Sequence, residues 1–135
     1  MQLARLSLIL TALVFGGFGT WLFLWPQTLA LVDVELTSPA ARTEIRAFYG
    51  GLELGCACFF AVAAARPGWY EAALHAQAAS LGGIAIARLL GMLIEASASS
   101  TLLMLLAAEV VGSLLAIVAL VRLRSRAGAP GNGPG

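Results

Sequence analysis

The stretch TLLMLLAAEVVGSLLAIVALV, residues 101–121, decides what kind of protein this is. Its only charged residue is Glu109, and its length matches the roughly 20 apolar residues that an α-helix needs to cross a bilayer. Three more apolar stretches of similar length precede it, at about residues 6–25, 44–65 and 69–94. The sequence therefore predicts an all-α fold, an integral membrane bundle of four transmembrane helices.

Composition agrees with this class and excludes others. The chain is 60% hydrophobic and 11% charged, with a mean hydropathy of +0.91, whereas soluble domains average about 25% charged residues. A net charge of +1 gives no reason to expect nucleic acid as a partner. The partner that the composition predicts is the lipid bilayer.

The remaining reactive residues do not predict an active site or a metal site. Cys56 and Cys58 lie two apart in an apolar stretch. On a helix they point about 200° away from each other, so they should neither form a disulfide nor chelate one metal. His75 is the only histidine, and a metal site needs more ligands. The sequence contains no Ser/His/Asp or Cys/His set for nucleophilic catalysis. We therefore expect no catalytic residue, no metal and no cofactor.

The boundaries of the spans suggest a single domain. The first stretch ends in an aromatic cluster and is longer than a signal-peptide core, so we expect a retained span. Ser38-Pro39 is typical of a helix start, and residues 27–37 should lie along the membrane surface. Residues 1–126 then form one four-helix transmembrane domain. The Gly- and Pro-rich tail, residues 127–135, should be disordered.

The arginines predict the orientation of the chain. In a four-span topology Arg5, Arg66, Arg122, Arg124 and Arg126 lie on one side of the membrane. The positive-inside rule places that side in the cytoplasm, so both termini should be cytoplasmic. The localisation that we expect is the inner, or cytoplasmic, membrane of a bacterium.

Four ionisable residues lie inside the predicted spans: Arg46, Glu53, Arg88 and Glu109. Such groups are costly in hydrocarbon and usually pair within the bundle or mark a functional site. At ~1.5 Å per residue, the last three lie about 9 to 12 Å below the outer ends of their helices. Each also falls on one stripe of its helix, and because charge that faces lipid is costly, these stripes should face each other. We therefore predict one buried Arg/Glu/Tyr cluster. Its candidate binding residues are Arg46, Tyr49, Gly50, Glu53, Arg88 and Glu109.

Such a cluster has more than one interpretation. The two arginines and two glutamates sum to zero charge, so they can neutralise one another and set the register of the helices. Alternatively, Glu109 borders a cavity left by Gly112 and Ser113, where it binds a ligand or changes its protonation state. A third interpretation is a surface that pairs with another membrane subunit.

A resemblance is carried by residues 43–55, TEIRAFYGGLELG. The stretch resembles the signature of a bacterial family of small four-span membrane proteins of unknown function, in which an Arg-x-x-Tyr-Gly-Gly core opens the second span. Arg46, Tyr49, Gly50 and Gly51 match that core. More distantly, the chain is similar to the DoxX-like four-span proteins, some of which are linked to thiol or quinone redox chemistry. The resemblance implies the four-span fold and no particular activity.

These observations favour a non-enzymatic role. The chain is expected to bind a small apolar or amphipathic ligand, or to act as an accessory subunit of a membrane complex, with a membrane-protein partner or as a homo-oligomer. A proton-coupled carrier of small molecules is the first alternative. A quinone- or thiol-linked membrane redox module is the second.

Overall fold

The computed structural model describes residues 1–127 of the chain, and the side chains of residues 1–125. These residues are helical apart from short links, and no strand occurs among them. The predicted tail, residues 127–135, lies outside the described residues except for Ala127, which ends the last helix. In chain order the elements are α1 (Gln2–Leu24), η1 (Pro26–Val32), α2 (Pro39–Ile45), η2 (Arg46–Gly51), α3 (Leu52–Ala64), η3 (Pro67–Trp69), α4 (Tyr70–Ile94) and α5 (Ser100–Ala127).

Four helical segments are long and apolar enough to span a membrane, so the predicted four-helix architecture is confirmed. They cover Gln2–Leu24, Pro39–Ala64, Pro67–Ile94 and Ser100–Ser125. The second segment begins where Ser38-Pro39 predicts, because the Ser38 hydroxyl accepts a hydrogen bond from the Ala41 N–H at 3.1 Å.

The second span is not a regular α-helix throughout. Between α2 and α3, the six residues of η2 form a π-helix, in which the Leu52 N–H donates to the Ala47 carbonyl five residues back. Short π-helical segments are rare and occur frequently at functional sites. This one contains the Arg-x-x-Tyr-Gly-Gly stretch.

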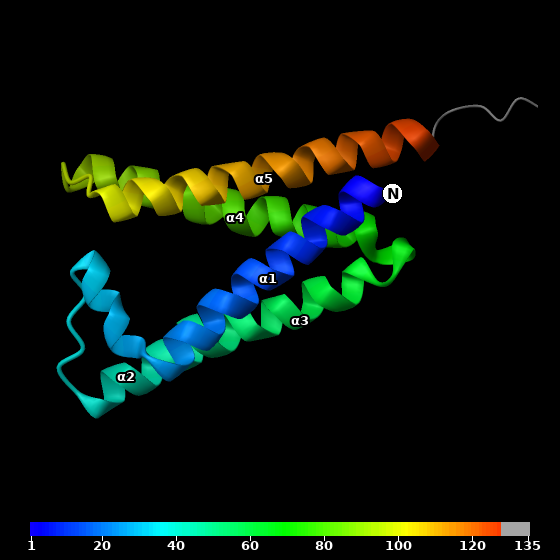
Figure 1. The fold of residues 1–135 in the computed structure, drawn as a ribbon. Coiled ribbons are helices and arrows are strands. Elements are labelled where there is room, and N and C mark those ends of the chain that lie inside the picture. Colours follow the sequence, from blue (N-terminus) through cyan, green and yellow to red (C-terminus); the bar gives the residue numbers. More distant parts are fainter. Residues whose placement is uncertain (128–135) are drawn as a thin grey trace, which may run out of the picture.

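The helices associate as two pairs (Figure 1): α1 runs beside η2 and α3, and α4 runs beside α5. Glycines permit the close approach within each pair. A Cβ added at Gly50 would lie 2.9 Å from the Cβ of Phe23 on α1. A Cβ added at Gly112 would lie 2.6 Å from Leu81 Cδ1 on α4. A larger residue at Gly50 would push η2 away from α1, because the Phe23 Cα is also only 3.0 Å away, whereas at Gly112 the Leu81 side chain would have to move.

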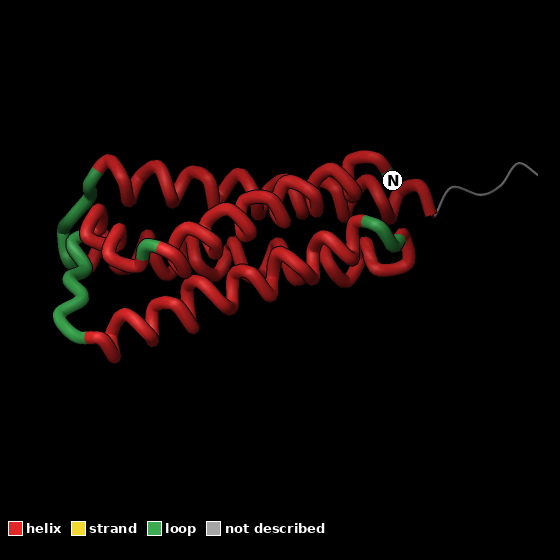
Figure 2. The backbone as a smooth tube through the Cα atoms, turned by 60° about the horizontal axis from the view of Figure 1, so that its bottom comes forward, coloured by secondary structure: helices red, strands yellow, loops and turns green. Residues whose placement is uncertain are grey.

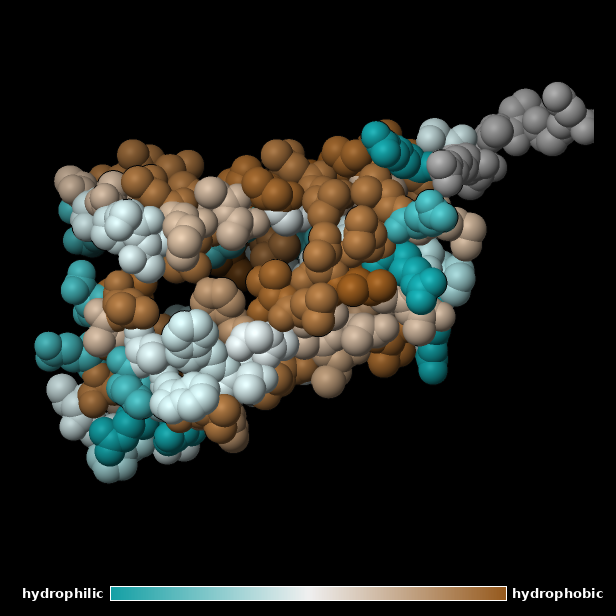
Figure 3. All heavy atoms as spheres, in the orientation of Figure 1, coloured by the Kyte–Doolittle hydropathy of each residue, from teal (hydrophilic) through white to brown (hydrophobic). Residues whose placement is uncertain are grey.

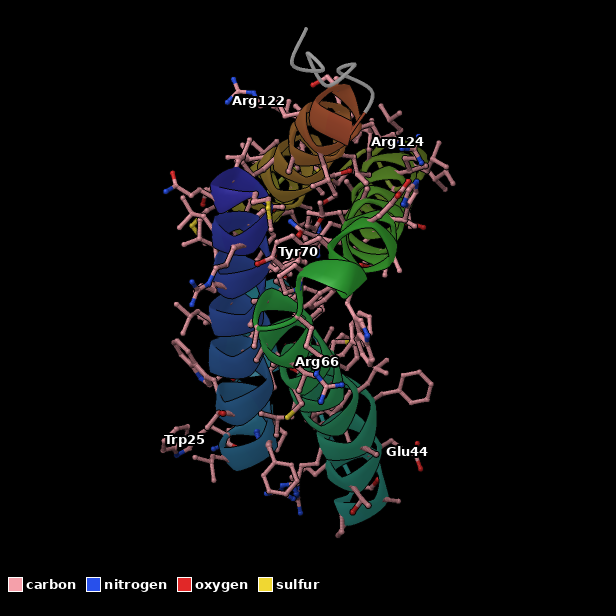
Figure 4. The ribbon with its side chains drawn as sticks, turned by 90° about the vertical axis from the view of Figure 1, so that its right-hand side faces the viewer. Trp25, Glu44, Arg66, Tyr70, Arg122 and Arg124 are labelled. Carbon is pink, nitrogen blue, oxygen red and sulfur yellow. The ribbon has the colours of Figure 1, made fainter. Side chains whose placement is uncertain are left out.

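The two pairs meet at one end of the bundle, which we call the closed end. It contains the start of α1, the end of α3, the start of α4 and the C-terminal part of α5 (Figure 1). Viewed from this end, Tyr70 lies between the helices, Arg66 lies in front of α3, and Arg122 and Arg124 lie at the periphery (Figure 4). The hydrophobic core consists of Ala4, Leu8, Phe60, Ala63, Ala64, Tyr70, Ala73, Leu74, Ala116, Ala119 and Leu120.

At the opposite end, which we call the open end, the pairs diverge (Figure 1). The long link that contains η1 and the link between α4 and α5 both lie here (Figure 2). The space-filling view has an opening between α4/α5 and the other helices at this end (Figure 3). We call this opening the interpair cleft. At this end η1 contacts both α1 and α5, and so links the two pairs.

Candidate functional site

The strongest polar contact at the open end joins the third and fourth spans. Arg88 on α4 donates to Glu109 on α5 through Nε, at 3.1 and 3.0 Å to the two carboxylate oxygens, and through Nη2 at 2.5 Å to Oε1. The two side chains are 23% and 12% exposed, respectively. The predicted pairing of Arg88 with a glutamate is therefore confirmed, with Glu109 as the partner.

The pair lies on the inner faces of its helices. Arg88 follows Gln77 by about three turns and so points in nearly the same direction. Gln77 is fully buried and accepts a hydrogen bond from Ser7 of α1 at 3.1 Å. Glu109 lies about two turns before Ala116, which belongs to the core at the closed end. Because the pairs diverge beyond Gln77, the Arg88–Glu109 pair borders the interpair cleft.

Arg46 lies elsewhere and stabilises the end of α1. Its Nε donates to the Phe23 carbonyl at 2.9 Å, in the last turn of α1, where carbonyl groups have no partner within the helix. Gly50, one turn further on, also packs against Phe23. In this arrangement two residues of the Arg-x-x-Tyr-Gly-Gly stretch join the first and second spans.

Among the described residues, the Glu53 side chain forms no hydrogen bond and no ion pair. Its Oε2 atom is buried without a hydrogen bond to any residue of the described chain. The Glu53 Cβ faces Gly19 of α1, where an added Cβ would be only 3.0 Å away. An unpaired carboxyl group in a helix that spans a membrane is costly and calls for a proton or a ligand as a partner.

Tyr49 lies on η2, three residues after Arg46. Its side chain is about half exposed, and its hydroxyl forms no hydrogen bond within residues 1–127.

The prediction of one buried Arg/Glu/Tyr cluster is wrong. Arg46 is bound to a backbone carbonyl, Arg88 is bound to Glu109, Glu53 stands alone and Tyr49 is half exposed. The cause is the divergence of the pairs, because residues at equal depth on α3 and α4 are held apart there. Whether these residues bind a ligand is untested and stays a prediction.

The space expected beside Glu109 is also filled. Gly112 packs against Leu81, and its carbonyl accepts a hydrogen bond from Gln77 Nε2 at 3.0 Å. The Ser113 hydroxyl donates to the Ala78 carbonyl at 3.1 Å. The small residues thus bring α4 and α5 together, and the open space lies between the two pairs.

The family described as a domain of unknown function (DUF4345) matches residues 3–120. The chain belongs to this family. Within DUF4345 the match extends from α1 to α5 and so includes all four spans. No curated protein and no solved structure matches the chain.

Sequence reasoning missed one feature of this DUF4345 chain, the hydrogen-bonded junction of three spans. Ser7 of α1 donates to Gln77 of α4, which donates to the Gly112 carbonyl of α5. The sequence did contain a signal for this junction, because Gln77 is a lone amide in an apolar span. A buried amide group must form hydrogen bonds. The junction lies where the closed end gives way to the interpair cleft.

The other candidate residues of the DUF4345 chain do not gather into a site. Cys56 and Cys58 are both free thiols. His75 Nδ1 lies 2.8 Å from the Glu71 carbonyl oxygen, while the Glu71 carboxylate accepts from Arg124 at 2.6 Å on the surface. Within residues 1–127, no group of three or more His, Cys, Asp or Glu residues is placed to hold a metal ion.

Proposed function

We propose that this protein binds a small amphipathic ligand inside the membrane, in the interpair cleft. The observation that carries the proposal is the incompletely covered Arg88–Glu109 pair on the inner faces of α4 and α5. Charged residues within a transmembrane segment face the bundle interior or a cavity and often mark a functional site. This pair borders an opening, so a bound molecule would complete its surroundings.

The chemistry of the cleft fits such a ligand. Binding sites for small molecules are mostly apolar, with a few polar groups that fix the orientation of the ligand. Here the spans supply apolar walls, and the Arg88–Glu109 pair supplies the polar groups. A ligand could enter sideways from the bilayer, because the pairs are separated along the open end (Figure 3).

The proposed setting is the inner membrane of a bacterium, with both termini in the cytoplasm. Arg5, Arg66, Arg122 and Arg124 belong to the closed end, and the positive-inside rule would place that end in the cytoplasm. Reporter fusions after residues 36, 67, 98 and 126 should then report outside, inside, outside and inside. A periplasmic signal from the last fusion would reverse the orientation.

The test of ligand binding is mass spectrometry of the protein purified in native nanodiscs. Gly91 lies about five turns after Ala73 on the same inner face of α4, and a Cβ there meets nothing within 4 Å. Gly91→Leu should therefore fill part of the cleft without a clash, and lower the amount of bound ligand severalfold. Gly83→Leu is the matched control, because Gly83 is equally free of contacts but exposed on another face.

The outcomes separate the candidate roles. Equal ligand content in wild type, Gly91→Leu and Gly83→Leu would contradict binding in the cleft. A membrane protein that co-purifies with all three, without a small molecule, would favour the accessory-subunit role instead.

A proton-coupled carrier is the second candidate, and the unpaired carboxyl of Glu53 favours it. A carrier of this kind needs an acidic group that can gain and lose a proton during transport. Flux of the identified ligand into proteoliposomes should then depend on a pH gradient. Glu53→Gln should abolish that dependence, and unchanged pH-dependent flux would remove Glu53 from the mechanism.

A further inference from the structure

We propose that the closed end binds an anionic phospholipid in a groove between α1 and α5, with the phosphate on Arg122 and one acyl chain along α5. This site is separate from the interpair cleft, because neither residue of the Arg88–Glu109 pair belongs to it. The proposal rests on the shape of the groove, on its length and on the charges at its end.

The groove consists of two adjoining hollows. The first has a volume of about 170 Å³ and lies between the start of α1 and the C-terminal part of α5, where the small core residues Ala4 and Ala119 line it. The second has a volume of about 410 Å³, within the range of roughly 300–1,000 Å³ that is typical of ligand sites. Leu3 and Arg122 line both hollows, which we together call the α1/α5 groove.

The second hollow is as long as one leaflet of a bilayer is thick. Its residues on α5 extend from Val111 to Arg122, which at ~1.5 Å per residue lie roughly 16 Å apart along the helix. The hydrocarbon core of a bilayer is about 30 Å thick, so one leaflet accounts for about 15 Å. The acyl chain of a lipid whose headgroup lies at Arg122 would therefore reach the middle of the bilayer within the groove.

The walls of the second hollow suit such a chain. Between Arg122 and the middle of the membrane, α5 contributes residues that recur every three or four positions and so share one face of the helix. These residues are Val111, Leu114, Leu115 and Val118, and α1 adds Leu3. All of them are apolar, so the hollow offers packing contacts to a hydrocarbon chain and no polar group to a soluble molecule.

The end of the groove carries a cation without an anion. Among the described residues, the Arg122 side chain forms no hydrogen bond and no ion pair, whereas Arg124 pairs with Glu71 on α4. Arg122 projects from α5 toward the side of α1, and Arg124 projects toward the side of α4 (Figure 4). Gln2 lines the first hollow together with Arg122, and its amide can donate a further hydrogen bond.

These charges favour an anionic headgroup. A guanidinium group can donate two parallel hydrogen bonds to one phosphate, and basic pockets between transmembrane helices bind anionic lipid headgroups. No described Asp or Glu residue lines either hollow, so the ammonium group of a zwitterionic lipid would have no carboxylate partner there.

Native mass spectrometry of the protein released from nanodiscs tests this proposal. The nanodiscs contain equal amounts of phosphatidylglycerol and phosphatidylcholine with identical acyl chains. We expect one phosphatidylglycerol molecule to remain bound per chain, at about five times the level of phosphatidylcholine. This ratio is the one that a single basic residue near a membrane surface provides.

One pair of variants tests the headgroup contact. Arg122→Gln should lower the ratio of bound phosphatidylglycerol to phosphatidylcholine to about one. Arg5→Gln is the matched control, because it removes the same charge at the same end of the bundle and Arg5 lines neither hollow. Both arginines are exposed, so neither substitution should change the thermal unfolding of the protein.

A second pair of variants tests the position of the acyl chain. Leu114→Trp should fill part of the second hollow and lower the amount of bound phosphatidylglycerol severalfold. Ile117→Trp is the matched control, because Ile117 lies one turn later on α5, is similarly exposed and does not line the groove.

Three outcomes would overturn the proposal. Equal retention of the two lipids by the wild type would contradict an anionic headgroup. Equal losses in Arg122→Gln and Arg5→Gln would mean that the basic end attracts anionic lipid in general, without a site at Arg122. Equal amounts of lipid in Leu114→Trp and Ile117→Trp would place the acyl chain outside the α1/α5 groove.

Discussion

The closed end and the open end of the bundle are built by different interactions. At the closed end all four spans contribute small or apolar side chains to one core, from Ala4 and Leu8 on α1 to Leu120 on α5. At the open end each pair is held separately, α1 to η2 through Arg46 and Phe23, and α4 to α5 through the Arg88–Glu109 pair.

This difference between the two ends indicates which part of the bundle can change its shape. Packed cores resist deformation because any shift opens voids, so the closed end should act as a fixed joint. The open end has no shared core among the described residues and can adapt its width to what lies in the interpair cleft. The predictions below compare the two ends, from the largest expected effect to the smallest.

The largest effect is expected at Arg88. Arg88→Leu leaves the Glu109 carboxylate largely buried and unpaired, which should destabilise the protein by about 3 kcal/mol. Adding Glu109→Leu should recover most of that loss, because the unpaired charge is gone. Thermal unfolding in mild detergent measures both. If Arg88→Leu melts like the wild type, the pair contributes nothing and the open end is held by other contacts.

The four spans were predictable because hydropathy depends only on local composition. Residues 101–121 are almost free of charge, and the start of the second span is marked by Ser38-Pro39. The pairing of the spans was not predictable in the same way. It depends on close approaches at particular glycines such as Gly50 and Gly112, whereas Gly55 and Gly83, in similar small-residue patterns, face open space.

The candidate site was predicted in part, for a physical reason. Depth along a helix follows from the residue number, so Arg88 and Glu109 were placed in one layer and do meet. The lateral distance between residues on different pairs of helices depends on the angle at which the pairs diverge. The spacing of residues along the sequence does not determine that angle. Glu53 was therefore assigned to a cluster that it does not join. The π-helical turn of η2 also escaped detection, because its sequence is compatible with an α-helix.

A second prediction compares the same substitution, Leu to Ala, at the two ends of the bundle. Leu74 is fully buried in the core of the closed end, whereas Leu90 on the same helix is 52% exposed near the open end. Leu74→Ala should cost about 2 kcal/mol, because a cavity forms and packing contacts are lost. Leu90→Ala should cost far less, since lipid can fill the space. Equal shifts in thermal unfolding would mean that the closed end has no special role.

The third prediction concerns the joint between α1 and η2. Arg46→Leu leaves the Phe23 carbonyl without its donor and should destabilise the protein by about 1.5 kcal/mol, the lower range for a hydrogen bond from a charged group. Arg42→Leu is the control, because Arg42 lies one turn earlier and its side chain forms no hydrogen bond within residues 1–127. If the two variants unfold at the same temperature, the Arg46 hydrogen bond does not stabilise the protein, and Arg46 has another role.

The smallest effect is expected at the junction between the two ends. Gln77→Leu removes hydrogen bonds to Ser7 and to the Gly112 carbonyl, and such bonds inside a membrane contribute only about 0.6 kcal/mol each on average. We therefore expect a loss of about 1 kcal/mol, with Ser7→Ala causing a smaller one. Because both substitutions break the same Ser7–Gln77 bond, the double variant should lose less than the sum of the single variants. Fully additive losses would show that α1 and α4 are not coupled through Gln77, and that the apolar core alone holds the closed end together.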